Sequence, residues 1–325
     1  MTHYTRAIAA TCLLLLSAGP ALAAYPDRPI KLIVPFPPGG GTDAVGRMIA
    51  EHMGKTLGQP IMVENDGGAG GTIAAKRAAR APADGYTLVM GNIGTHGAAP
   101  AYYPDLPYDP AKDFTPIGLS AGFPMLIVTR KDFPAKTLPE FIDYTRKNQT
   151  KVNEAHSGVG SQSHTVCTLL QSILGIRTGR LAYRGIAPAL NDLIAGHVDF
   201  ECLGLGSAFP HIQSGAIKAI AIASPKRVEL IGDVPTTAEG GLPQFRASGW
   251  SAMFAPRNLP ADVQARLSDA LTKALDDERV RSRLLGIGAE IPEAQERTPQ
   301  ALQKLVESEI ARWSAALKIV SPSNR

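Results

Sequence analysis

Three glycines follow the first predicted strand of the chain and precede its first predicted helix. The strand covers 30–34, the entry to the loop is stiffened by Pro37 and Pro38, and Gly39–Gly41 lead to the helix. Glycines permit close backbone approach, and a helix N-terminus offers unpaired N–H groups with partial positive charge. The loop is therefore predicted to bind an anion through its main chain. Its candidate residues are Phe36, Pro38, Gly39, Gly40, Thr42 (the expected N-cap) and Asp43 (in the first helical turn).

Four further glycine-rich loops follow predicted strands, at 65–72, 91–97, 157–164 and 183–188. One such loop is usually only a turn, but five at strand ends favour a shared anion site. Ser161 is the expected N-cap of the helix after the fourth loop. The candidate ligand-binding residues from these loops and from a later strand end are Gly70, Thr95, His96, Gly158, Gly160, Ser161, Ser163, His164, Tyr183, Arg184, Gly206 and Ser207.

Other chemistries compete for some of these residues. Gly39-x-Gly41-x-x-Ala44, with Glu64 about 20 residues further on, fits a relaxed dinucleotide-binding pattern, although Asp43 would set a negative charge beside the pyrophosphate. Arg184 could pair with a ligand carboxylate or form an ordinary ion pair. The sequence lacks H-E-x-x-H and G-x-S-x-G motifs, so we predict no metal, no cofactor and no catalytic residue.

The composition is that of an ordinary globular protein of two domains. Of 325 residues, 44% are hydrophobic and 19% charged, and 33 Lys and Arg face 29 Asp and Glu. Because the resulting charge of +4 is scattered, neither nucleic acid nor an anionic membrane is an expected partner. We expect a monomer.

The elements that must position the loops alternate between strands and helices. Strands at 30–34, 61–63 and 87–90 with intervening helices form a βαβαβ unit, and a second α/β unit runs from 138 to 223. Two separate strands are expected at 117–120 and 125–129. A strand at 248–254 and helices at 261–275 and 299–317 then return to the first unit. The predicted fold class is therefore α/β, with two lobes, each a mostly parallel sheet flanked by helices, hinged about a central cleft.

The predicted boundaries place a signal peptide at 1–23, lobe 1 at 24–123 and 244–325, and lobe 2 at 124–243. Arg6, the leucine run at 13–16 and Ala21-Leu22-Ala23 are typical of a cleaved export signal, so the protein is expected in the periplasm. Disulfides could form there, but the spacing of Cys167 and Cys202 specifies no pair, and we expect two buried thiols.

Seven motifs in this order resemble the periplasmic solute-binding receptors of tripartite tricarboxylate transporters, the Bug-type receptors. The matching stretches span the mature chain: 25–30, 34–43, 68–71, 83–88, 183–189, 233–236 and 249–256. The resemblance implies a fold with two lobes that closes on a small carboxylate and delivers it to membrane permease subunits, without chemistry. It also implies that the loops 38–43 and 157–164 hold one ligand carboxylate, partly through ordered waters.

The sequence departs from this family at two loops. Leu203-Gly204-Leu205-Gly206-Ser207 stands where members often carry Asp or Asn, and the loop 94–97 lacks the polar residue often found after its His. These departures suggest a ligand with an apolar or aromatic body instead of a compact hydroxylated acid. Two alternative functions stay open, a ligand-sensing receptor for a sensor kinase and a secreted enzyme that uses the same cleft.

Overall fold

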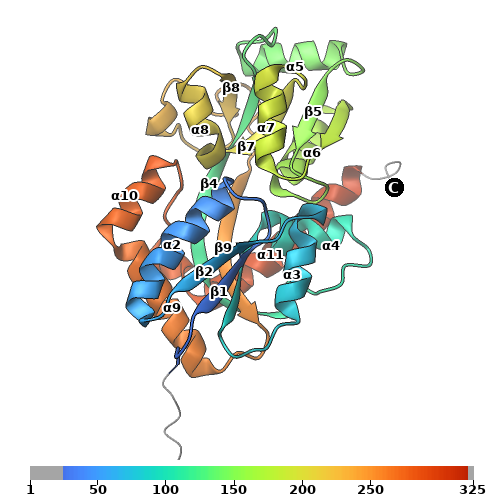
Figure 1. Cartoon of the computed structure of the whole chain (residues 1–325). Helices are drawn as coiled ribbons and strands as arrows, with labels where there is room; N and C mark the ends of the chain where they lie inside the picture. Colours follow the sequence, from blue (N-terminus) through green and yellow to red (C-terminus); the bar gives the residue numbers. More distant parts are fainter. Residues whose placement is uncertain (1–24, 321–325) are drawn as a thin grey trace, which may run out of the picture.

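The computed structural model describes residues 25–320, so the predicted signal peptide lies outside the described residues. Nine strands form one twisted, mixed sheet that divides into two half-sheets (Figure 1). In the first half-sheet, β1 (Ile30–Val34) pairs in parallel with β2 (Ile61–Asn65) and β3 (Thr87–Asn92). In the second, β5 (Asn153–His156) pairs in parallel with β6 (Gly179–Ala182) and β7 (Phe200–Gly204).

Antiparallel strands connect the two half-sheets. The long strand β4 (Phe114–Arg130) pairs through its residues 114–124 with β9 (Ser248–Pro256), which also pairs with β3. From Met125 onward, β4 pairs instead with β7 and with β8 (Ile217–Ile222). The expectation of two separate strands at 117–120 and 125–129 is therefore wrong. Gly122, Phe123 and Pro124 continue the strand, because all three have partners on β9.

The change of strand partners along β4 supports the predicted division into lobes. We keep that division as a proposal, with the chain passing from one lobe to the other near 122–124 and near 242–244. Figure 1 shows β4 and β9 running through the centre of the molecule, with the remaining strands of each half-sheet above and below.

Helices cover both faces of each half-sheet, as expected for α/β architecture. They are α2 (Gly41–Leu57), α3 (Thr72–Ala79), α4 (Ala99–Tyr102), α5 (Leu138–Lys147), α6 (Gln162–Leu174), α7 (Ile186–Ala195), α8 (Leu205–Gln213), α9 (Ala261–Asp276), α10 (Glu278–Gly286) and α11 (Pro299–Val320). Three short 3₁₀ helices, η1 (Ala69–Gly71), η3 (Glu229–Ile231) and η4 (Ala294–Glu296), and one π-helix, η2 (Ile93–Ala98), complete the described elements. Within residues 25–320, no helix combines the length and the apolar character needed to cross a bilayer.

The hydrophobic core continues from one half of the molecule into the other. Trp313 of α11 and Leu170 of α6 belong to one buried cluster, although their helices flank different half-sheets. A second cluster joins α2 and α9 to the opposite face of the first half-sheet, and a third joins α7 and α8 to the second half-sheet. Residues from both half-sheets and their helices thus share one buried cluster.

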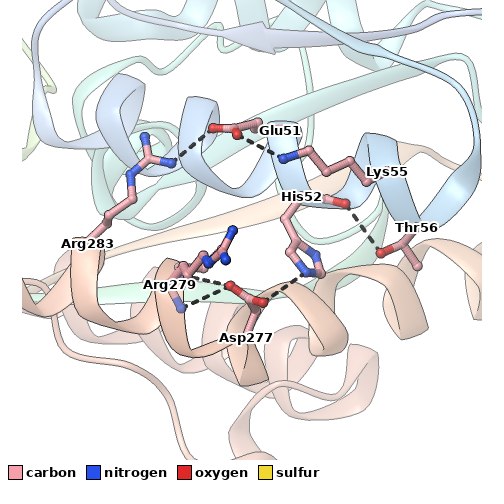
Figure 2. A network of polar contacts seen from close by, with 8 residues as sticks. Glu51, His52, Lys55, Thr56, Asp277, Arg279 and Arg283 are labelled. Carbon is pink, nitrogen blue, oxygen red and sulfur yellow. Dashed lines mark hydrogen bonds and ion pairs between the residues drawn. The ribbon is translucent and has the colours of Figure 1, made fainter.

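Polar contacts hold the C-terminal part of α2 against α10 (Figure 2). Glu51 accepts from Lys55 at 3.1 Å and from Arg283 at 3.0 Å, while His52 Nε2 lies 3.6 Å from an oxygen of Asp277. Asp277 also caps α10, accepting from main-chain N–H groups in its first turn. Such partly exposed pairs each contribute little stability, but together they orient α2, whose other end reaches the cavity described below.

Cys167 of α6 and Cys202 of β7 form a disulfide, with their Cα atoms 5.4 Å apart. The expectation that both residues are buried is confirmed, but the expectation that they are free thiols is wrong. Their separation of 35 positions in sequence carries no pairing signal, since the bond depends on α6 packing across β7.

Candidate binding site

A cavity of about 650 Å³, including its open mouth, lies between the two half-sheets. None of its lining residues is charged. They are Phe36, Pro37, Pro38, Gly40, Gly41, Thr42, Asn92, Phe123, Met125, Ser157, Gln162, Ser163, Ile186, Ala187, Cys202, Gly204 and Ser207.

Four helices begin at this cavity. The first residues of α2, α6, α7 and α8 contribute to its lining. The N-caps of α2, α7 and α8 are Gly40, Gly185 and Gly204, which have no side chain to occupy the free N–H groups of the first turn. The partial positive charge of each helix N-terminus is thus directed at a cavity without any cationic side chain. The arrangement can bind an anion through main-chain donors and hydroxyl groups.

Asp43 braces the glycine loop from behind and does not line the cavity. Its carboxylate accepts hydrogen bonds from Gly39 N–H at 3.0 Å, from Arg47 Nε at 3.0 and 3.1 Å and from Asn65 Nδ2 at 2.8 Å. Burial alone would raise the pKa of Asp43, but these hydrogen bonds lower it below its ordinary value. The negative charge of Asp43 is thereby compensated within the loop. Gly39, with a φ of +92°, supplies the left-handed bend that this contact requires.

The predicted N-cap of α2 is wrong by two residues. The helix begins at Gly41, its N-cap is Gly40, and Thr42 is inside the first turn, where it lines the cavity. The predicted cap of α6 is confirmed, because the Ser161 hydroxyl accepts from the His164 N–H.

Two histidines hold the loop at 157–160 in its bent form. Nδ1 of His156 accepts from Gly158 N–H at 3.3 Å, and Nδ1 of His164 accepts from Gly160 N–H at 3.2 Å. Burial lowers the pKa of His156 to about 4 and, together with the charges of His156 and Arg180, lowers that of His164 to about 3. Both rings are therefore neutral at ordinary pH and can accept these bonds.

His96 and Thr95 lie in the core beside the site. The His96 ring is fully buried and stacks on Phe254 with ring centroids 4.1 Å apart. Burial lowers its pKa to about 3. Thr95 completes a capping box with Asn92, whose side-chain oxygen accepts from the Gly94 and Thr95 N–H groups. These contacts orient Asn92, which does line the cavity.

The structure brings six of the candidate residues to the cavity and places the others around it. Phe36, Pro38, Gly40, Thr42, Ser163 and Ser207 line it. Gly70 packs against the main chain of 159–161, and Gly206 lies beside the ring of Phe123. Tyr183 donates to Asp192 at 2.6 Å, and Arg184 is exposed. A direct contact between any of these candidates and a ligand stays a prediction.

Several lining residues escaped the sequence reasoning. Phe123 and Met125 sit where β4 changes partners, and Cys202 lies within β7, positions that carry no chemical motif. Gln162 stands inside a predicted binding loop but is not among the residues predicted to bind the ligand. Its side-chain N–H donates to the Met125 thioether at 3.2 Å, a weak acceptor, so the amide keeps hydrogen-bonding capacity for a ligand.

The described residues contain no group of three or more His, Cys, Asp or Glu that could hold a metal ion. A hinged α/β fold with an uncharged cavity at helix N-termini is the architecture of a solute-binding protein.

Comparison with known proteins agrees with this class. Residues 45–321 match the sequence model of the tripartite tricarboxylate transporter family receptors. MatC from Rhodopseudomonas palustris, solved with bound malate, is 44% identical, with a TM-score of 0.88 and coverage of 91% of this chain and 100% of that one. The periplasmic binding protein BugD is 39% identical, with a TM-score of 0.87 and coverage of 91% and 98%. A second R. palustris protein, solved with adipate, is 33% identical, with the same TM-score and the same coverage as BugD.

The chain therefore belongs to the tripartite tricarboxylate transporter receptor family, and it is a periplasmic solute-binding receptor with the fold of that family.

Proposed function

We propose that this receptor binds a small carboxylate in the cavity between its half-sheets and delivers it to the membrane permease subunits of a tripartite transporter. The observation that carries the proposal is the convergence of four helix N-termini, three of them with glycine N-caps, on a cavity without charged side chains. A carboxylate satisfies such donors without a counter-ion from the protein. Malate and adipate in related structures support this ligand class.

The ligand body is proposed to be apolar. Phe36, Phe123, Met125 and Ile186 line the cavity, and the remaining side chains there are small or neutral. Burying aliphatic or aromatic surface against them is favourable by roughly 25 cal/mol per Å². A compact hydroxylated acid would leave much of this surface without contact, whereas an acid with a methylene chain or a ring would cover it.

Isothermal titration calorimetry of the purified receptor tests both parts. The panel contains adipate, benzoate, malate and citrate, together with adipamide, the neutral analogue of adipate. We expect adipate or benzoate to bind more tightly than malate and citrate, and adipamide not to bind. Tight binding of malate or citrate without any response to adipate or benzoate would contradict the apolar body. Equal binding of adipamide would contradict anion capture.

Delivery, export and the absence of chemistry are separate parts of the proposal. Ligand recovered unchanged after long incubation would support a receptor and count against a secreted enzyme. Loss of carboxylate uptake on deletion of neighbouring permease genes would support transport. Loss of a transcriptional response on deletion of a neighbouring histidine kinase would favour the sensor.

Mass spectrometry of the secreted chain is expected to place its first residue near Ala24, and light scattering is expected to give a monomer.

A further inference from the structure

The disulfide lies in the wall of the proposed binding cavity. Cys202, in the second half-sheet, is one of the lining residues, and its partner Cys167 is placed behind it in α6. Both side chains are fully buried in the structure, so the bond lies between the cavity and the core. Its position is therefore different from that of a surface cross-link.

The two cysteines sit on α6 and β7, which carry much of the cavity wall on the side of the second half-sheet. Ser163, which lines the cavity, precedes Cys167 by four residues, one helical turn, on α6. Gly204, the N-cap of α8, follows Cys202 by two residues and lies on the same face of β7. A bond at this place sets the distance between the start of α6 and the end of β7.

The side chains at the start of α6 depend on that distance. The Ser163 hydroxyl accepts from Ser157 N–H at 3.0 Å, which ties the helix to the bent loop. Gln162 reaches over the sheet, with its amide nitrogen 3.2 Å from the sulfur of Met125. A Cβ added at Gly204 or Gly249 would meet this amide nitrogen at 3.6 or 2.2 Å, so the amide fills a narrow space. A small displacement of α6 would move both Gln162 and Ser163 relative to the cavity.

We infer that the Cys167–Cys202 disulfide is a positioning element of the binding site, and that Cys202 lies directly behind the part of the cavity wall that the ligand body covers. This inference rests on the proposed function. Opening the bond with a dithiol reductant adds two electrons and two protons to give two thiols, while the reductant becomes a cyclic disulfide. Because two thiols need more room than two bonded sulfurs, α6 or the cavity wall must shift.

The first test compares adipate binding by calorimetry in three proteins. They are the oxidised parent, the Cys167→Ala/Cys202→Ala variant and a matched control, Leu170→Ala. Leu170 is fully buried one turn further along α6, so its truncation weakens the same helix while leaving the disulfide in place. We expect at least a tenfold loss of affinity in the double variant and less than a twofold loss in the control.

The second test does not require the variants to fold. The parent is reduced in mild conditions and exposed to N-ethylmaleimide, with and without adipate, and both cysteines are followed by mass spectrometry. We expect adipate to slow modification of Cys202 several-fold. Cys167, which does not line the cavity, should react equally with and without adipate once opening has occurred.

The outcomes separate the inference from the function on which it rests. If the oxidised parent binds adipate and the double variant binds it equally well, the positioning role is wrong while the receptor function stands. Equal modification of Cys202 with and without bound adipate would show that the ligand does not cover this part of the cavity wall. If the oxidised parent binds none of the carboxylates in the calorimetric panel, the proposed function and this inference both fail.

Discussion

Replacing Asp43 by Asn should damage both the stability of the receptor and its affinity, although Asp43 does not line the cavity. The carboxylate accepts from three donors, and each of its oxygens has two hydrogen-bond partners within 3.1 Å. An asparagine has only one acceptor oxygen, so its NH₂ group must face two donors. The substitution therefore removes about two hydrogen bonds to a charged group, whichever way the amide is turned.

The magnitude follows from these contacts. Hydrogen bonds to charged groups contribute roughly 1.5–3 kcal/mol each. Because the Arg47 side chain is about half exposed, at 49%, its share is discounted for solvent screening. We expect Asp43→Asn to lower the free energy of unfolding by about 2–4 kcal/mol. Without its anchor, Gly39 must also be ordered on ligand binding, which costs about 1–2 kcal/mol per residue, or roughly tenfold in affinity.

Urea unfolding and calorimetry with adipate measure the two effects. Asp143→Asn serves as the control, because Asp143 forms an exposed ion pair with Lys147 on α5 and should change stability by less than about 0.5 kcal/mol. The contribution of Asp43 should also depend on pH. Since its folded-state pKa is lowered, the stability is present above the ordinary value of 3.8 and is lost as the pH falls below it. If Asp43→Asn matched the control in stability and the parent in affinity, the bracing role would be refuted.

Three further predictions concern other positions. Gly40→Leu should fold, since a Cβ there meets nothing within 4 Å, but its side chain should obstruct the cavity and weaken adipate binding more than tenfold in calorimetry, with little change in Tm. Tyr103→Phe removes a 2.7 Å hydrogen bond to the Val159 carbonyl and should lower the free energy of unfolding by about 1 kcal/mol in urea; an unchanged value would show that the contact is not stabilising. Glu201 is fully buried with both carboxylate oxygens unpartnered, and burial, together with Glu154, raises its pKa well above 4.5. Above pH 4.5 the carboxyl ionises in the unfolded chain but stays protonated in the folded one, so the free energy of unfolding falls by about 1.4 kcal/mol per pH unit. Glutamine does not ionise in either state, so Glu201→Gln should be more stable than the parent at pH 8 but not at pH 4.

The order of the elements and the place of the glycine loops can be predicted from the sequence alone. The strand at 30–34, the bend at Gly39 and the cap at Ser161 all follow from local patterns of apolar residues, glycines and capping side chains. These signals act over a few residues, so they can be recognised without knowing what packs against them. The same patterns led to the family, whose fold the structure confirms.

Which side chains face the cavity depends on how distant elements pack together, and local patterns do not reveal it. Met125, Gln162 and Cys202 come together because β4, α6 and β7 pack side by side. The side chain of His96 turns into the core instead, and that of Asp43 turns toward the glycine loop that it supports. The disulfide has the same origin. Pairing between segments tens of residues apart depends on strand register and helix packing, and no short window of sequence carries that information.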